Sequence, residues 1–279
     1  MSVNWKYAIC VELLLKKGLT HKQIFEKLVA WGYHGLEITP FTLEKLITEA
    51  STAELQSLAK LAAEHGIDLC AMHWFYSGVP GVHLTSSDPE TRWRTLTYTC
   101  KALEACNTLG VVIVVIGSPR QRSFDPEEMD SSTAYLNAIE LLKLAAPHAE
   151  KHNVDICFEP LGPDETNFGN TMEDCAFLVD SVGSPRVVPH LDVKQLQSED
   201  TQATELITRW GAKAGHFHAN GANMLGPSNS GLDFAPIFEA LARSGYEGGW
   251  VSVESFKEVP DIELQAAEDI VCMRAAEPK

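Results

Sequence analysis

The segment "VVIVVIG", residues 111–117, is apolar at six consecutive positions before its glycine. Successive side chains of a β-strand point to opposite faces, so a strand that is apolar throughout is buried on both faces. Strands of this kind occur in parallel sheets that are covered by helices. The segment therefore predicts a parallel sheet in an α/β protein.

Similar short segments recur along the chain, and stretches with helical spacing separate them. The other seven predicted strands are residues 7–13, 35–39, 68–74, 155–160, 187–193, 214–220 and 249–256. Eight strand-then-helix units close a (β/α)8 barrel, and 279 residues suit one such barrel. We therefore predict a single TIM-barrel domain over residues 1–279. The alternative, an open doubly wound sheet, lacks its usual G-x-G-x-x-G after the first strand.

Capping residues mark where several of the predicted helices begin. Ser51 and Glu54 have the spacing of a capping box, while Asp88 and Asp233 precede two further helical patterns as N-caps. Residues 43–50, "LEKLITEA", have the pattern of a short amphipathic helix. These signals support the alternation of strands and helices on which the barrel prediction depends.

The composition limits the classes of partner. The net charge is −16 and the isoelectric point is near 5.0, which disfavours nucleic acid and favours a small-molecule partner. Seven cysteines without a CxxC pair are typical of reduced thiols in a cytoplasmic protein. Every apolar stretch is too short to span a membrane, so no membrane contact is expected.

Four consecutive predicted strands end in ionisable residues, namely Glu159, Asp192, His218 and Glu254. In a barrel the active site lies at the carboxyl ends of the strands, so these side chains would meet. Each alone has an ordinary explanation: a solvated glutamate, a helix-capping aspartate or a hydrogen-bonded histidine. Together, three carboxylates and an imidazole would repel one another unless they held a cation. This donor set suits Mn²⁺, Mg²⁺ or Co²⁺, with Zn²⁺ as the alternative.

The pattern "FEP…HLD…HFH…SVESF", together with "WGYHGLEITPFT" at residues 31–42, resembles the sugar phosphate isomerase/epimerase family of xylose isomerase-like TIM barrels. That family includes ketose 3-epimerases, hydroxypyruvate isomerases, inosose isomerases and, more distantly, endonuclease IV. The resemblance implies that Glu159, Asp192, His218 and Glu254 bind one divalent metal ion. It also implies that Glu159 and Glu254 are the acid/base catalysts, and that the protein forms a homo-dimer or tetramer.

The chemistry of that family fits these residue types. A divalent ion bound to the carbonyl and hydroxyl of a ketose acidifies the C–H between them and stabilises a cis-enediolate. Two carboxylates can then remove and return the proton. Return to the opposite face gives epimerisation, and return to the neighbouring carbon gives isomerisation. We therefore expect a metal-dependent isomerase or epimerase acting on a sugar, a sugar phosphate or a related keto or hydroxy compound.

Two positions depart from the family pattern. Gln195 stands where many relatives carry a histidine, and Met224 stands where ketose 3-epimerases carry an arginine. Both residues contact substrate in those relatives, so the departures disfavour simple D-ketose 3-epimerisation. Glu165, six residues after Glu159, matches an epimerase glutamate that lies near the substrate. The missing histidine and the acidic charge also disfavour the endonuclease.

Further residues near the strand ends are candidates for substrate contacts. His73 and Trp74 could bind a sugar hydroxyl and stack on the sugar ring, or pack as ordinary residues at the barrel rim. Arg120 and Arg122 suit an anionic or phosphorylated substrate, with ion pairs to loop carboxylates as the alternative. The other candidates are Glu37, Glu165, Lys194, Gln195 and Asn220.

Three other functions remain open on the same scaffold. A lyase or dehydratase acting on a keto-sugar or inosose would share the enolisation step. A non-catalytic sugar-binding barrel predicts a degraded ligand set, and an abasic-site endonuclease predicts a basic face with additional histidines. Neither of the last two patterns is present in the sequence.

Overall fold

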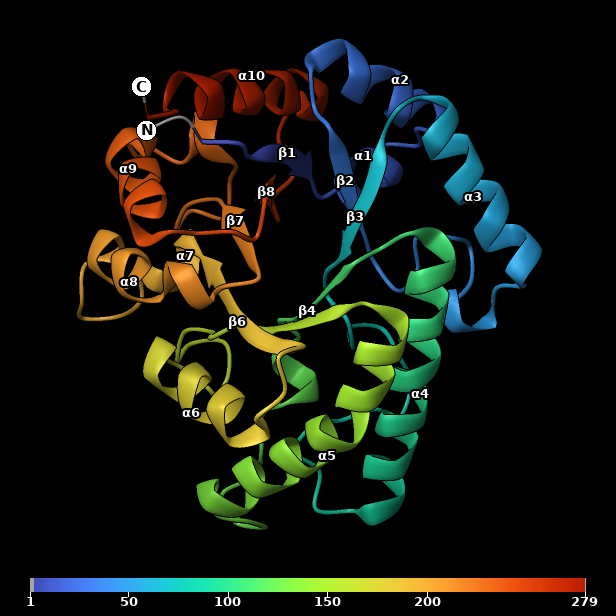
Figure 1. Ribbon diagram of the computed structural model, residues 1–279, viewed down its shortest axis with the longest axis vertical. Coiled ribbons are helices and arrows are strands. Elements are labelled where there is room, and N and C mark those ends of the chain that lie inside the picture. The colour runs from blue at the N-terminus through green and yellow to red at the C-terminus, as the bar shows by residue number, and fades with distance from the viewer. Residues whose placement is uncertain (1–2, 279) are drawn as a thin grey trace. The chain divides into compact units, whose positions relative to one another are not determined.

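In the computed structural model, which describes residues 3–278, strands and helices alternate along the chain (Figure 1). The strands are β1 (Lys6–Ile9), β2 (Gly35–Ile38), β3 (Asp68–Met72), β4 (Ile113–Ile116), β5 (Asp155–Phe158), β6 (Val187–Asp192), β7 (His216–Ala219) and β8 (Trp250–Val253). Their order is β1-β8-β7-β6-β5-β4-β3-β2, and a parallel bridge between Cys10 and Glu37 links the segments of β1 and β2. All eight predicted strands are confirmed, as is the (β/α)8 fold class.

Ten α-helices are described between and after these strands. They are α1 (Glu12–Lys16), α2 (His21–Trp31), α3 (Thr52–Glu64), α4 (Pro89–Leu109), α5 (Ser131–His152), α6 (Met172–Val182), α7 (Val193–Leu196), α8 (Ala203–Trp210), α9 (Phe234–Ser244) and α10 (Ile262–Ala275). The predicted caps are confirmed. Ser51 and Glu54 exchange hydrogen bonds before α3, and the carboxylates of Asp88 and Asp233 accept backbone N–H groups at the starts of α4 and α9.

The largest boundary errors fall on the first predicted strand and on the helix predicted over 43–50. The first strand was predicted over residues 7–13, but β1 ends at Ile9 and α1 begins at Glu12. Glu, Leu and Lys are all good helix formers, so the run "ELLLK" leaves the extended conformation. The helix predicted over 43–50 is reduced to one 3₁₀ turn, Ile47–Glu49. Two adjacent β-branched residues in this turn lose side-chain freedom in an α-helix, which disfavours a longer one.

The chain divides into two compact units. The first comprises the residues up to 38, residues 59–70 and those from 190 onward, and the second comprises 39–58 and 71–189. In the first unit β1 pairs with β8, β8 with β7, and β7 with the last residues of β6. In the second unit β4 pairs with β5 and with the end of β3, and β5 pairs with the first residues of β6. The single domain expected over 1–279 stays a prediction.

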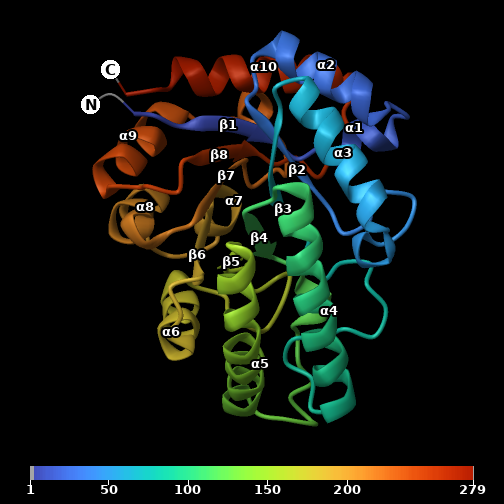
Figure 2. The same cartoon turned by 45° about the vertical axis from the view of Figure 1, so that its right-hand side comes forward.

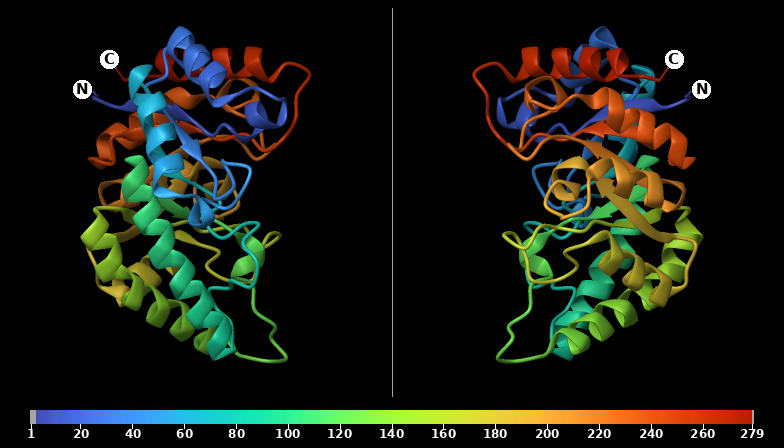
Figure 3. Two further views of the ribbon diagram at one scale, coloured as in Figure 1. Left: turned by 90° about the vertical axis from the view of Figure 1, so that its right-hand side faces the viewer. Right: turned by 90° about the vertical axis from the view of Figure 1, so that its left-hand side faces the viewer.

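Helices bury the apolar strands within each unit. All four residues of β4 are buried, as the all-apolar segment predicted. In the second unit α4 and α5 run side by side (Figures 1 and 2). In the first unit α10, drawn in red, lies beside α2, drawn in blue (Figure 3), and Arg274 Nη2 donates a hydrogen bond to the Gly32 carbonyl at 2.6 Å.

Every helix within residues 3–278 falls short of the length and apolar character needed to cross a bilayer.

Candidate active site

The first unit gathers polar side chains at the carboxyl ends of β6, β7 and β8. Asp192 ends β6, His218 lies in β7, and Asn220 and Glu254 directly follow β7 and β8. Asp192 and His218 are also register partners in the parallel ladder. All four residues are at most 2% exposed. Three of the four predicted metal ligands therefore meet within this unit.

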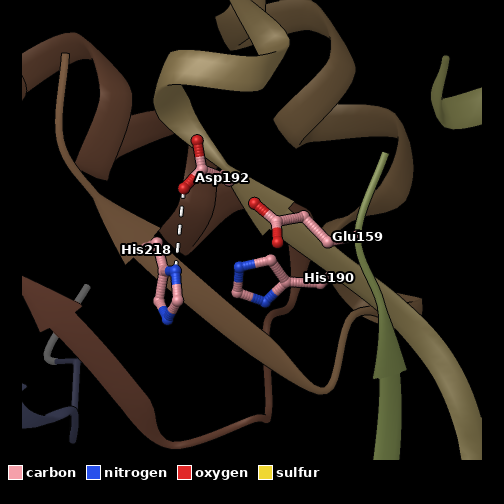
Figure 4. Close-up of side chains that lie close together, drawn as sticks. All are labelled: Glu159, His190, Asp192 and His218. Carbon is pink, nitrogen blue, oxygen red and sulfur yellow. Dashed lines mark ion pairs between the residues drawn. The ribbon is translucent and has the colours of Figure 1, made fainter. Parts of the chain in front are cut away.

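Two carboxylates converge on one nitrogen of His218. Its Nδ1 atom lies 3.2 Å from Glu254 Oε2 and 3.6 Å from Asp192 Oδ2, and Figure 4 marks the pair with Asp192. The side-chain amide of Asn220 donates to both carboxylates, at 2.7 Å to Asp192 Oδ2 and 3.0 Å to Glu254 Oε2. Two buried carboxylates that point at one locus need a positive charge between them.

Protonation of His218 provides such a charge. Burial alone would lower the pKa of His218, but the carboxylates of Glu254 and Glu37 raise this pKa well above its usual value. Burial would raise the pKa of Asp192, but the neighbouring His218 keeps it below its usual value. The cluster is therefore built for a cation at Nδ1, and its nitrogen and oxygen donors also suit a divalent metal ion.

The opposite edge of His218 faces a third carboxylate. His218 Nε2 lies 3.1 and 3.2 Å from the two oxygens of Glu37, and His216 Nε2 lies 2.6 Å from Glu37 Oε1. Burial would raise the pKa of Glu37, but His218 and His216 hold it well below its usual value. An ionised carboxylate only accepts hydrogen bonds, so both Nε2 atoms donate to Glu37. This arrangement directs Nδ1 of His218 toward Asp192 and Glu254, as carboxylates behind metal-binding histidines do.

The turn after β6 is held by the same cluster. Asp192 Oδ1 accepts the backbone N–H of Gln195 at 2.9 Å and so caps α7, while Asn220 Oδ1 accepts the backbone N–H of Lys194 at 2.8 Å. The Gln195 side chain is buried, and Lys194 Nζ lies 6.0 Å from the ring centroid of Phe256. Asp192 thus serves as a helix cap and as a member of the cluster at once.

The fourth predicted ligand, Glu159, lies in the second unit beside Gly117 and Arg122. Glu159 directly follows β5 and is 5% exposed. A Cβ atom added to Gly117 would lie 1.7 Å from Glu159 Oε2, so the carboxylate occupies space that only glycine leaves open. Arg122 is fully buried, its Nη1 donates to the Glu159 carbonyl at 2.6 Å, and its guanidinium lies 4.9 Å from the Phe158 ring centroid. Burial lowers the pKa of Arg122 to about 10, and Glu159 opposes that shift.

The other predicted substrate contacts in this unit lie on loops after the strands. His73 is buried, Trp74 is half-buried, and their rings meet edge to face with centroids 5.4 Å apart. Arg120 is exposed and Glu165 is half-buried. The backbone of Trp74 has a φ of 52°, in the left-handed region, and Met224 of the first unit has a φ of 66°. Contacts of these residues with a sugar stay predictions.

Three residues of functional interest were missed in the sequence. His190 lies two residues before Asp192 on β6, and its ring centroid is 4.3 Å from that of His218 (Figure 4). Cys10 has its sulfur within 4.8 Å of ligand atoms of His218 and Glu254. His190 could have been found from its spacing, because residues two apart on a strand share a face. The role of Gly117 has no comparable signal, since it depends on a distance in the folded chain.

One family model matches most of the chain, and several of the similar proteins are sugar epimerases. The family model described as "Xylose isomerase-like TIM barrel" matches residues 25–276. A D-psicose 3-epimerase from Enterocloster bolteae is 29% identical over 252 residues, which cover 88% of this chain and 81% of the relative. Another D-psicose 3-epimerase, from Ruminiclostridium cellulolyticum, is 25% identical over 83% of this chain and 77% of its own.

Solved structures share the fold. The structure of a D-psicose 3-epimerase with D-tagatose from Clostridium cellulolyticum H10 superposes with a TM-score of 0.82 at 22% identity, covering 98% of this chain and 100% of that chain. The apo structure of a 3-keto-D-glucoside 4-epimerase from Escherichia coli gives a TM-score of 0.82 at 17% identity, covering 97% and 99%. These likenesses confirm the predicted TIM-barrel fold.

Proposed function

The chain belongs to the xylose isomerase-like TIM barrel family, and we propose that it is a divalent-metal-dependent sugar epimerase or isomerase. The relatives named as epimerases support the isomerase class. One observation carries the metal dependence: the carboxylates of Asp192 and Glu254 converge on Nδ1 of His218, at 3.6 and 3.2 Å, in a fully buried cluster. The substrate is a sugar, a sugar phosphate or a related keto or hydroxy compound.

The proposed metal ligands are Glu159, Asp192, His218 and Glu254. Carboxylate oxygens and one imidazole nitrogen suit Mn²⁺, Mg²⁺ or Co²⁺ better than a thiolate-preferring ion, and Zn²⁺ remains the alternative. When bound, the ion supplies Lewis acidity that makes the C–H beside a sugar carbonyl acidic. Glu37 supports this role because its carboxylate holds Nε2 of His218 and leaves Nδ1 directed at Asp192 and Glu254.

The two glutamates are proposed to move the proton. One takes it from the acidic carbon and the other returns it, either to the opposite face of that carbon or to its neighbour. Burial of Glu159 and Glu254 to 5% and 2% exposure keeps water from competing for that proton. Sugar contacts are proposed for six of the nine further candidates, namely His73, Trp74, Arg120, Glu165, Lys194 and Gln195. The other three, Glu37, Arg122 and Asn220, are fully buried and bond to groups within the protein, so we propose supporting roles for them.

The test combines metal analysis of the purified protein with deuterium exchange followed by NMR. We expect about one divalent ion per chain, and exchange of a C–H beside the carbonyl in at least one member of a panel of ketoses, ketose phosphates, 3-keto-sugars and inososes. A stable product that has lost water would instead identify a dehydratase. Absence of exchange with every panel member, despite bound metal, would overturn the proposal.

Glu254→Gln provides the matched variant for the proton transfer. It keeps the shape of the side chain but removes the base, so we expect exchange to fall by at least about 100-fold. Glu140→Gln, on the exposed face of α5, is the control and should exchange at the wild-type rate. Full exchange by Glu254→Gln would remove this residue from the mechanism.

A further inference from the structure

The side chain of Asn220 uses both its amide group and its carbonyl oxygen within the first unit. It is completely buried, and its Nδ2 group donates to Asp192 Oδ2 at 2.7 Å and to Glu254 Oε2 at 3.0 Å. Its Oδ1 accepts the backbone N–H of Lys194 at 2.8 Å. Both amide hydrogens and the amide oxygen are therefore committed within the protein.

These hydrogen bonds join three strand ends. Asn220 directly follows β7, Asp192 ends β6 and Glu254 directly follows β8. One planar amide with a fixed angle between its two N–H bonds thus sets the orientation of two carboxylates from neighbouring strands. Hydrogen bonds to carboxylates are stronger than neutral ones, and burial strengthens them further.

The arrangement also limits which oxygens are available. Asp192 Oδ1 accepts the backbone N–H of Gln195, and Asp192 Oδ2 accepts from Asn220. Glu254 Oε2 likewise accepts from Asn220. Asp192 is therefore held at both oxygens and Glu254 at one, and the oxygens bound to Asn220 lie nearest Nδ1 of His218.

We propose that Asn220 is a positioning residue that fixes the carboxylates of Asp192 and Glu254 for a small divalent cation. This inference rests on the proposed metal site and goes beyond it, because it assigns ion selectivity to a residue that is not a ligand. Mg²⁺ and Mn²⁺ need short, well-defined distances to their ligands, whereas Ca²⁺ accepts longer distances and more oxygens. A rigidly held carboxylate pair therefore favours the smaller ions, and a released pair admits Ca²⁺.

The test is calorimetric titration of the metal-free protein with MnCl₂ and with CaCl₂. Asn220→Ala removes both hydrogen bonds to the carboxylates together with the one from the Lys194 N–H. We expect Mn²⁺ affinity to fall about 10- to 100-fold while the preference for Mn²⁺ over Ca²⁺ shrinks. Asn223→Ala is the matched control, because Asn223 lies in the same loop and its side chain bonds to the backbone of Leu225 and Asn229. It should bind Mn²⁺ like the wild type.

A second variant covers the case in which Asn220→Ala does not fold. Asn220→Ser adds no charge and provides a hydroxyl, but one hydroxyl has a single hydrogen to donate and cannot hold both carboxylates. We expect it to fold and to lose the preference for Mn²⁺ over Ca²⁺. Wild-type affinity and preference in the variants would overturn this inference and leave the proposed function standing. Failure of the wild-type protein to bind any divalent ion would overturn both.

Discussion

The carboxylates at the strand ends are held in two different ways in the two units. In the first unit side chains hold side chains, since Asn220 bonds Asp192 and Glu254 and Glu37 bonds His218. In the second unit the space beside Gly117 admits the Glu159 carboxylate, and the Arg122 side chain holds the Glu159 carbonyl oxygen. The first arrangement is therefore sensitive to exchange of donors and acceptors, and the second to added volume.

The largest loss of exchange activity is expected from a single methyl group added in the second unit. Gly117→Ala places a Cβ 1.7 Å from Glu159 Oε2, so the carboxylate must move. A displacement of about 1 Å can cost about 100-fold in rate, and overpacking costs about 1–3 kcal/mol of stability. The measurements are kcat for the exchange reaction and the free energy of unfolding in urea.

Gly245→Ala is the control for that substitution. Its φ of 79° strains a side chain, but nothing lies within 4 Å of the added Cβ. We expect a stability loss of about 1 kcal/mol with unchanged exchange. A Gly117→Ala protein with wild-type kcat would show that the space at Gly117 does not set the position of the Glu159 carboxylate.

An intermediate effect is expected in the first unit from a substitution with almost no change in volume. Glu37→Gln removes the charge that accepts from His216 and His218, so the orientation of the His218 ring loosens. Changes behind a metal-binding histidine typically cost 10- to 100-fold in metal affinity, and we expect a loss in that range. Calorimetry with MnCl₂ measures it, with the exposed Glu44→Gln as the control. Unchanged affinity would contradict the side-chain support assigned to this unit.

The smallest effect on exchange activity is expected from substitution of Asp269. Its carboxylate binds the loop after β7 and not a proposed metal ligand. Asp269 Oδ1 accepts the N–H and the hydroxyl of Ser228 at 2.8 and 2.6 Å, and a Cβ on Gly226 would lie 2.3 Å from Oδ2. Burial raises the pKa of Asp269 to about 6. The folded state therefore binds this proton more tightly than the unfolded state does.

This difference in proton affinity makes the free energy of unfolding depend on pH. The stabilising contribution of Asp269 is full below its unfolded pKa and falls as the pH rises toward about 6, by about 1 kcal/mol per pH unit. Asp269→Asn should lack this component, so its free energy of unfolding relative to wild type should increase between pH 4 and 6. Exchange activity at pH 7 should change less than in the two variants above. Parallel pH profiles of unfolding for the two proteins would contradict the assignment.

The positions of the strands, the helix caps and the four ionisable residues at strand ends were predictable because each depends on local spacing. The period of two along a strand identifies His218, and an apolar run identifies β4. The hydrogen bonds from Asn220 to Asp192 and Glu254 were not predictable. They depend on the register among β6, β7 and β8 and on the side-chain rotamers. The boundary of β1 at Ile9 also escaped prediction, because Val11 and Leu13 suit a strand as well as the helix that begins at Glu12.

The left-handed backbone at Trp74 and Met224 has a consequence for how this protein can change over generations. A third non-glycine residue with positive φ, Asn153, ends a helix, which is an ordinary place for asparagine. Trp74 and Met224 instead follow β3 and β7, and each costs about 1 kcal/mol relative to glycine. Selection for heat resistance alone would favour glycine at both positions. Lineages that retain tryptophan and methionine at these positions would be those in which the two side chains contribute to fitness through something other than stability.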